Sequence, residues 1–259
     1  MKSHSLTSMY EPLPEALRNR LVGEEDELPD FGPADPESLK NYRVALVMTH
    51  GPELPEFHVP LNYLRNRGAS VDVVTQDWLF DYQPPGTEGL VVLAQWLATN
   101  VCVKADIKIS NAKIEDYDAV IFIGGAWNPI MLRTDEAVQN FIRNAHRRKL
   151  LIASICHGPQ VLISANTSSK VLNGQFVFDE SERRLFPRGT LVTGVDDIKV
   201  DLANAGFNVL NELVVYDEGQ RLITSPNPKC LALKAFCEQI GIRLLEVFPI
   251  AGTAPNMDN

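Results

Sequence analysis

The stretch of the sequence best suited to chemistry is residues 150–165, LLIASICHGPQVLISA. Cys156 ends a run of branched apolar residues, His157 follows at once, and Gly158 and Pro159 precede a second apolar run with helical spacing. A strand that breaks sharply into a helix lifts one side chain out of the backbone, as in the nucleophile elbow of hydrolases. Nearby backbone amides and the helix dipole favour a thiolate and can hold a developing oxyanion. The stretch therefore predicts a nucleophilic thiol beside a proton acceptor.

The elements that must position this pair alternate between strands and helices from Arg43 onward. Near-continuous apolar runs at 44–50, 71–75, 119–125 and 149–156 predict buried strands, and residues 59–68 and 135–149 have helical spacing. This alternation indicates a parallel sheet that is buried on both faces. A strand at 191–194, a helix through 196–206, a hairpin at 213–225 and a helix at 230–246 complete the prediction.

The domain organisation predicted from composition is a single α/β domain with appendages. Residues 1–40 form an acidic, proline-rich arm, residues 41–250 the domain, and residues 251–259 a flexible tail. Two segments, near 78–103 and 166–189, are longer than a minimal connection and are interpreted as insertions. In the first, a proline turn followed by an amphipathic helix is expected.

Charge and composition exclude several classes of function. The formal net charge is −9, so nucleic acid is not an expected partner. No run of about eighteen apolar residues predicts a membrane span, and no apolar signal core begins the chain. The four cysteines match no zinc spacing and are too few for a disulfide framework, so free thiols in a reducing cytoplasm are expected. Burial as a small apolar side chain accounts for the three other than Cys156.

The segment SICHGPQVLISA closely resembles the nucleophile motif of the DJ-1/PfpI superfamily, in particular the PfpI branch, where histidine directly follows cysteine. ELPEFHVPLNYLRNRGASVDVV, YDAVIFIGGAWNPIMLRTDEAV and VDDIKVDLANAGFNVLNELVVYDEGQRLITSPNP resemble further parts of the family, so that the likeness covers roughly residues 43–240. It implies an α/β, flavodoxin-like three-layer sandwich with a mostly parallel central sheet and helices on both faces. It also implies a homo-oligomer without a metal or other cofactor.

The resemblance assigns roles residue by residue. Glu56 matches the carboxyl group that hydrogen-bonds the nucleophile and is usually protonated, and Glu53 matches a second acidic position. A carboxyl group in a dry crevice has a raised pKa and can donate, although most glutamates are simply exposed. Gly124 and Gly125 end the third strand, and the amide of Gly125 would form an oxyanion site with that of His157.

His157 resembles the family's general base, which the PfpI branch orients with a carboxylate from a neighbouring subunit. Ile130 stands where that acid is expected, and the acids at 135–136 lie farther along the helix. An imidazole without its orienting carboxylate is a weaker base, which weakens the expectation of a hydrolytic triad. We expect Trp127 and Asn128 to line the mouth of the crevice.

The function that the resemblance implies is a cysteine-dependent enzyme acting on small electrophiles, of the glyoxalase III or deglycase type with methylglyoxal as the substrate class. One alternative is a PfpI-type hydrolase, an intracellular protease or amidase with a peptide substrate. Another is a redox-sensing or chaperone-like stress protein without turnover. The histidine favours an enzyme, since a sensor has no use for a base beside the thiol. A glutamine amidotransferase is set aside because no histidine follows His157.

Overall fold

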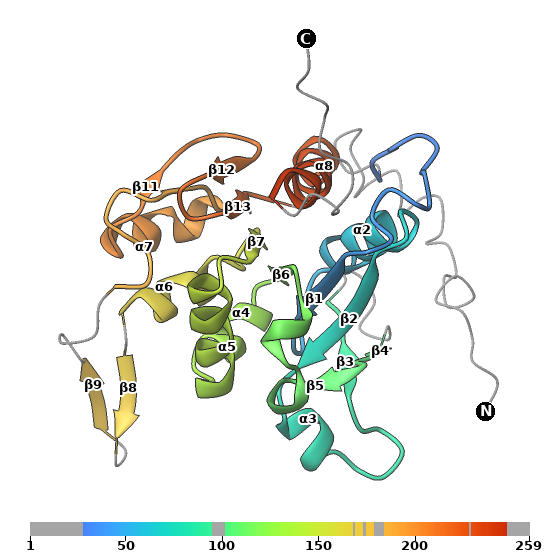
Figure 1. The fold of residues 1–259 in the computed structure, drawn as a ribbon. Coiled ribbons are helices and arrows are strands. Elements are labelled where there is room, and N and C mark those ends of the chain that lie inside the picture. The colour runs from blue at the N-terminus through green and yellow to red at the C-terminus, as the bar shows by residue number, and fades with distance from the viewer. Residues whose placement is uncertain are drawn as a thin grey trace, which may run out of the picture.

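The computed structural model describes residues 28–94, 102–167, 169–172, 175–178, 184–227 and 229–247. Its centre is a seven-stranded sheet with the strand order β12-β13-β7-β6-β1-β2-β5 (Figure 1). The strands of this sheet are β1 (Arg43–Val47), β2 (Ser70–Thr75), β5 (Ile107–Lys108), β6 (Ala119–Phe122), β7 (Leu151–Ile155), β12 (Val215–Asp217) and β13 (Leu222–Ser225). Every neighbouring pair is parallel except β12 and β13, which form an antiparallel hairpin. The predicted α/β fold with a mostly parallel sheet is thereby confirmed.

Helices cover both faces of this sheet. They are α2 (Leu54–Arg65), α3 (Trp78–Asp81), α4 (Asn128–Leu132), α5 (Glu136–Arg147), α6 (Gln160–Thr167), α7 (Lys199–Asn204) and α8 (Cys230–Val247), with single 3-10 turns at η3 (Ile109–Asn111), η4 (Ile114–Asp116) and η5 (Asp196–Ile198). Three small two-stranded sheets pair β3 (Leu90–Val92) with β4 (Cys102–Lys104), β8 (Ser169–Leu172) with β9 (Gln175–Phe178), and β10 (Leu191–Val192) with β11 (Asn208–Val209). Across the described residues, none of the helices combines the length and the apolar character needed to cross a bilayer.

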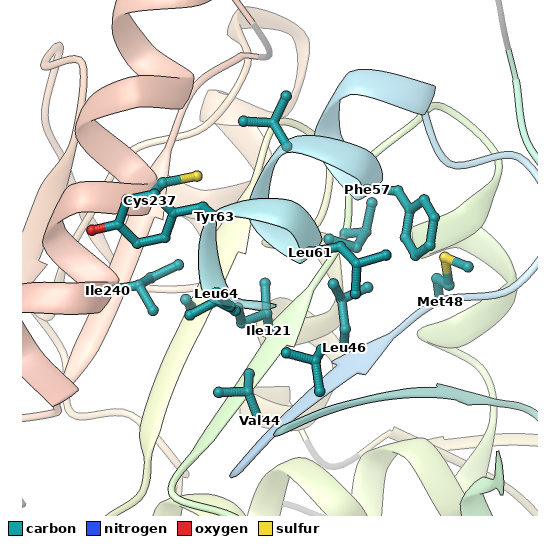
Figure 2. Packing of buried hydrophobic residues seen from close by; sticks show 14 of the residues in the cluster. Val44, Leu46, Met48, Phe57, Leu61, Tyr63, Leu64, Ile121, Cys237 and Ile240 are labelled. Carbon is teal, nitrogen blue, oxygen red and sulfur yellow. The ribbon is translucent and has the colours of Figure 1, made fainter. Parts of the chain in front are cut away.

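Two apolar clusters, one on each face, hold the layers together. Along β1, Val44 and Leu46 belong to the cluster under α2 and α8, whereas Ala45 and Val47 belong to the cluster under α5, α6 and α7. This alternation follows from the two-residue period of a strand. Figure 2 shows the first cluster, in which Leu61 and Leu64 of α2 face the sheet and Tyr63 lies beside Cys237 of α8. Burial on both faces explains why the strands have near-continuous apolar sequences.

The helix after β1 begins earlier than the sequence predicted. Periodicity placed it at 59–68, but α2 runs from Leu54 to Arg65. Pro60 lies inside the helix, and a proline is more common in a first helical turn, which made a later start plausible. The earlier start brings the acidic residue Glu56 into the first turn of the helix and fixes its position.

The prediction of an amphipathic helix within 78–103 is wrong for the part of this segment that the structure describes. Leu90–Val92 form strand β3, which pairs with Cys102–Lys104, while residues 95–101 lie outside the described ranges. β-Branched residues at 91 and 92 favour a strand, and Val91 is buried while Val92 is partly exposed. Beyond the strand, Ala94 pairs with Glu53, so the segment lies beside the loop that precedes α2.

The end of the predicted N-terminal arm lies against α2. Leu39 is fully buried and its amide donates to the carbonyl of Arg67, and the ring of Phe31 contacts that of Tyr63. Residues 1–27 and the predicted tail at 251–259 lie outside the described residues. The division of the chain at residue 40 stays a prediction.

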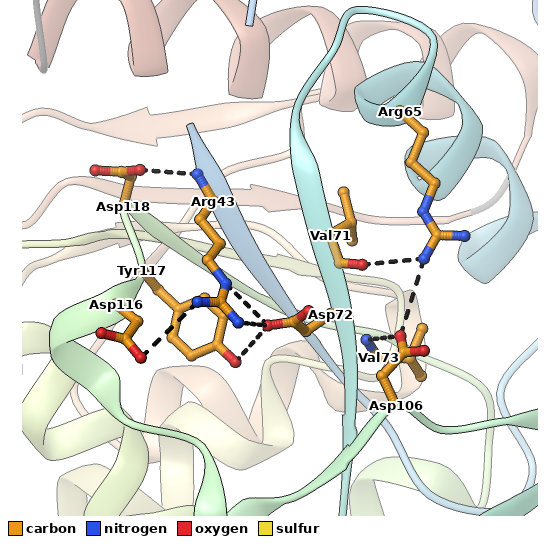
Figure 3. Close-up of polar contacts among 9 residues, drawn as sticks. All are labelled: Arg43, Arg65, Val71, Asp72, Val73, Asp106, Asp116, Tyr117 and Asp118. Atoms are coloured by element: carbon orange, nitrogen blue, oxygen red, sulfur yellow. Dashed lines mark hydrogen bonds and ion pairs between the residues drawn. The ribbon is translucent and has the colours of Figure 1, made fainter. Parts of the chain in front are cut away.

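Polar contacts join the sheet at the amino-terminal ends of its strands (Figure 3). Asp72 Oδ2 on β2 accepts hydrogen bonds from Arg43 Nη2 at 2.7 Å and from Tyr117 Oη at 2.9 Å. Asp118 Oδ2 accepts the backbone amide of Arg43 at 2.8 Å, which ties β1 to the start of β6. These contacts lie at the edge opposite to the carboxyl ends of the strands, where ligands bind in open α/β folds.

We predict that Gly68→Ala destabilises the fold more than Gly86→Ala. Both glycines have φ near +88°, but a methyl group at 68 would collide with the backbone of Pro36, whereas the space around 86 is open. Strain alone should lower the free energy of unfolding by about 1 kcal/mol in each variant. The collision should add about 1–3 kcal/mol at position 68, measured by urea unfolding. Equal losses in the two variants would contradict the packing of residues 36–40 on the end of α2.

Candidate active site

Cys156 lies directly after β7 in a strained backbone conformation. Its φ is +58°, in the left-handed region that residues with a side chain rarely occupy. The amide of Cys156 donates to the carbonyl of Ser225 on β13, and its carbonyl accepts the amide of Val195. Hydrogen bonds on both sides hold the turn that the sequence predicted as a nucleophile elbow.

Gly158 makes this sharp turn possible. A Cβ atom there would lie 2.7 Å from the carbonyl oxygen of Phe122 and 2.8 Å from that of Ile155, both of which are too close. The backbone at 158 therefore packs directly on the ends of β6 and β7 before α6 begins at Gln160. The glycine is explained by this close approach.

The side chain of Cys156 is 6% exposed and lies against the carboxyl group of Glu56. Only the backbone of Gly124 lies between these two side chains. A Cβ atom at 124 would collide with Glu56 Oε2 and would lie 2.7 Å from Cys156 Cβ. Both oxygens of Glu56 are buried, and neither has a partner at full hydrogen-bond geometry. The Cys156 thiol and the amides of Gly124 and Gly125 are close enough to lower the pKa of this carboxyl group.

Burial governs the ionisation of this pair. It raises the pKa of Glu56 to about 8, against the weaker opposing effects of the Cys156 thiol and the two glycine amides. The carboxyl group is therefore mostly protonated at neutral pH and can act as a donor.

Burial also raises the pKa of the Cys156 thiol, and a charged Glu56 raises it further. The amides of Gly125 and His157 lower the pKa of the thiol, as expected for a site that stabilises an anion. Their effect is smaller than that of burial, so the resting group is a thiol rather than the thiolate that the helix dipole suggested. A base is needed to take its proton.

His157 is placed to be that base. Its Nδ1 lies 3.3 Å from Cys156 Sγ, and its Nε2 lies 3.0 Å from Asp197 Oδ2. A carboxylate can only accept, so Nε2 carries the proton and Nδ1 of the neutral ring is free to receive the thiol proton. The geometry is that of a Cys-His-Asp triad within a single chain.

Asp197 is the candidate site residue that sequence reasoning missed. The acid was sought near position 130, but Ile130 is exposed on α4. Asp135 instead caps α5 and accepts a hydrogen bond from Gln76. A usable signal was present: Asp197 follows the apolar strand at 191–194, and the ends of strands are where α/β folds place their sites.

Glu53 lies in the loop that covers the glycine turn. A Cβ atom at Gly125 would lie 2.8 Å from Pro52 Cα and 3.0 Å from the amide nitrogen of Glu53. The Glu53 side chain is half-buried and makes no capping hydrogen bond to α2. Burial raises the pKa of Glu53, a protonated His157 would lower it, and the charge of Glu53 in turn raises the pKa of Glu56. The structure thus brings this predicted site residue close to the reacting pair.

The two residues expected at the mouth of the site differ in position. Trp127 is 73% exposed, with its Cβ next to Gly51. Asn128 is fully buried instead of lining a crevice: its Oδ1 accepts the amide of Thr49, and its Nδ2 donates to the carbonyls of Ile123 and Gly124. It is a positioning residue, because these bonds fix the glycine turn against β1. Within the described ranges, no group of three or more His, Cys, Asp or Glu side chains is arranged to hold a metal ion.

Comparison with known proteins identifies the family of this chain. The profile of the DJ-1/PfpI family matches residues 42–175, which include the elbow and the glycine turn. General stress protein 18 of Bacillus subtilis (strain 168) is 29% identical over 186 residues, covering 72% of this chain and 89% of that protein.

Solved structures show the same α/β three-layer fold. DJ-1beta of Drosophila melanogaster covers 79% of this chain and 90% of its own, with a TM-score of 0.61 at 21% identity. DJ-1 of Schizosaccharomyces pombe covers 80% of this chain and 92% of its own, with a TM-score of 0.58 at 21% identity. With the matched profile spanning more than half of its length, this chain belongs to the DJ-1/PfpI family.

Proposed function

We propose that this protein is a cofactor-independent enzyme whose Cys156 attacks small reactive aldehydes, with methylglyoxal as the model substrate. The observation that carries the proposal is the chain of contacts from Cys156 Sγ to His157 Nδ1 at 3.3 Å and from His157 Nε2 to Asp197 Oδ2 at 3.0 Å. A buried thiol with a raised pKa is a poor nucleophile unless a base takes its proton. This contact supplies the base.

The proposed reaction begins with addition to the aldehyde. The sulfur of Cys156 bonds to the aldehyde carbon while His157 Nδ1 takes the thiol proton. The imidazolium of His157 or the carboxyl group of Glu56 then protonates the carbonyl oxygen, which becomes the hydroxyl of a hemithioacetal. The amides of Gly125 and His157, which face the sulfur, support the negative charge that develops on oxygen. Asp197 stabilises the imidazolium that forms.

A proton transfer between carbons completes the chemistry. The group that protonated the oxygen, His157 or Glu56, is then unprotonated and acts as the base. It carries the proton of the former aldehyde carbon to the neighbouring oxygen, giving an enediol, and then moves the proton of the first hydroxyl to the neighbouring carbon. The product is a lactoyl thioester on Cys156. Water hydrolyses it to lactate and restores the thiol, so that one methylglyoxal and one water give one lactic acid. No oxidant or reductant is consumed.

A cysteine hydrolase acting on amides is the second candidate. It is favoured by the same Asp197 contact, because an oriented Cys-His pair and an oxyanion site are the parts that acyl transfer requires. The chain would then act on a peptide or small amide through an acyl-enzyme. The two reactions would use the same residues, and they would differ in which substrate the surroundings of the elbow admit.

A thiol sensor receives less support. Such a protein needs an exposed thiol of low pKa, whereas Cys156 is 6% exposed and burial raises its pKa. A Bacillus subtilis relative is named a general stress protein, which fits removal of reactive aldehydes as well as sensing. We place this chemistry in a reducing cytoplasm, where the free cysteines of the chain would stay reduced.

Turnover of methylglyoxal to lactate by the purified protein tests the proposal. We expect wild-type turnover, none above background in Cys156→Ala, and a loss of about 10²-fold or more in His157→Ala. Cys237→Ala serves as the control, since this buried cysteine lies on α8 beside Tyr63 of α2 (Figure 2). Lactate formation that persists in Cys156→Ala, or its absence from wild type, would refute the aldehyde reaction. In the latter case an amide substrate panel would test the second candidate.

Substitution of Asp197, with the neighbouring Asp196 as the control position, tests the role of this acid. Asp197→Asn should lower kcat by about 10²-fold or more, with little change in KM, because the imidazole loses its orienting carboxylate. Asp196→Asn is the matched control: Asp196 is almost fully exposed and bonds Lys199 at 2.7 Å instead of His157. We expect its kcat to stay within about twofold of wild type. Equal effects of the two substitutions would contradict the intrachain triad.

A further inference from the structure

Carboxyl groups approach the reacting pair from three separate elements. Glu56 comes from the first turn of α2, Glu53 from the loop before it, and Asp197 from η5. The one basic partner shown among them is His157, which Asp197 contacts at 3.0 Å. When Glu56 is protonated, the carboxyl groups of Glu53 and Asp197 still face one imidazole, so the centre has an excess of negative charge at any pH that keeps both ionised.

Glu53 is the carboxyl group that the reaction does not use. Its neighbours Gly51 and Pro52 lie on the Gly125 turn, and Ala94 pairs with it from the segment that follows β3. Its side chain is half-buried and close enough to His157 and Glu56 for their charges to interact. A charged group held in a partly desolvated position acts more strongly on its surroundings than one in bulk water.

The nearest basic residue along the chain is already neutralised. Lys199, two positions after Asp197, donates to Asp196 Oδ1 at 2.7 Å and to Asn211 Oδ1 at 2.8 Å. Its charge is therefore balanced by Asp196 instead of offsetting Asp197. Among the described residues, no ion pair joins a lysine or arginine to Glu53 or Asp197, so a substrate that carries a carboxylate or phosphate would meet these two acids without a compensating cation.

We propose that Glu53 and Asp197 make the site selective by charge, so that it accepts neutral and cationic carbonyl compounds and rejects anionic ones. The acceptable class includes methylglyoxal and carbonyl adducts of amines. The rejected class includes 2-oxo acids and phosphorylated aldehydes. Glu53 is the specificity-determining residue, because it lies beside the reacting pair without taking part in proton transfer. This inference rests on the proposed function only in that Cys156 is the group that reacts.

Three thiol reagents of the same chemistry and length test the selectivity without turnover. The 2-aminoethyl, 2-hydroxyethyl and 2-sulfonatoethyl methanethiosulfonates are cationic, neutral and anionic, and each transfers its thioalkyl group to a cysteine and releases methanesulfinate. Rates at Cys156 are read by peptide mass spectrometry. The partly exposed Cys102 and Cys230 in the same sample provide the reference for reagent reactivity and overall protein charge.

We expect the cation-to-anion rate ratio at Cys156 to exceed that at Cys102 by about tenfold or more at low ionic strength, and to fall as salt is added. Glu53→Gln should lower the ratio several-fold. The matched control is Glu115→Gln, which removes the same charge from an exposed turn before β6, at the opposite edge of the sheet. Its ratio should stay at the wild-type value.

The outcomes separate this inference from the proposed function. A Cys156 that reacts with all three reagents in the same proportions as Cys102 would refute charge selectivity and leave the aldehyde enzyme standing. An unchanged ratio in Glu53→Gln would refute the role of that residue. A Cys156 that fails to react even with the neutral reagent would overturn both proposals, because no substrate could then reach the thiol.

Discussion

A single buried contact, between the carboxyl group of Glu56, the backbone of Gly124 and the side chain of Cys156, is the constraint on which the rest of the centre depends. Only glycine fits at 124, since any Cβ atom there would collide with both partners. The contact leaves Cys156 6% exposed and Glu56 fully buried, and this burial raises the pKa of both titratable groups. A protonated carboxyl group and a neutral thiol are the forms that such an environment favours.

The other parts of the centre follow from that environment. A buried thiol needs a base, which explains the imidazole at 3.3 Å from Sγ. The base needs an orienting partner, and the hydrogen bond from the amide of Val195 to the carbonyl of Cys156 brings η5, with Asp197, to the elbow. The positive φ of Cys156 is stabilised by the same bond and by Ser225 on the neighbouring strand. The proton acceptor, its orienting acid and the strained backbone of Cys156 are thus all held by hydrogen bonds near the carboxyl ends of neighbouring strands.

The sequence predicted what depends on local pattern and missed what depends on packing. Apolar runs gave the strands, and the break at Cys156 and Gly158 gave the elbow, because a sharp turn requires particular residues locally. The preceding strand marked Asp197 as one of several candidate acids, but the sequence did not show which acid meets His157, because the two residues lie 40 positions apart in the chain. Asn128 was predicted to line the crevice, yet it is fully buried, where it makes hydrogen bonds to residues from other parts of the chain. Residues 90–92 adopt a strand because β4 is available to pair with them.

The protonation state of Glu56 tests the central claim most directly. Carbon-13 NMR of protein labelled at the glutamate carboxyl groups, followed across pH, measures it in the intact chain. We predict one carboxyl signal that titrates at about pH 8 and is absent from Glu56→Gln, as burial against Cys156 requires. If Glu56 instead titrates with the exposed glutamates, near its ordinary pKa of 4.5, the carboxyl group is solvated and charged at neutral pH. The dry thiol–carboxyl contact, and the need for His157 that follows from it, would then be wrong.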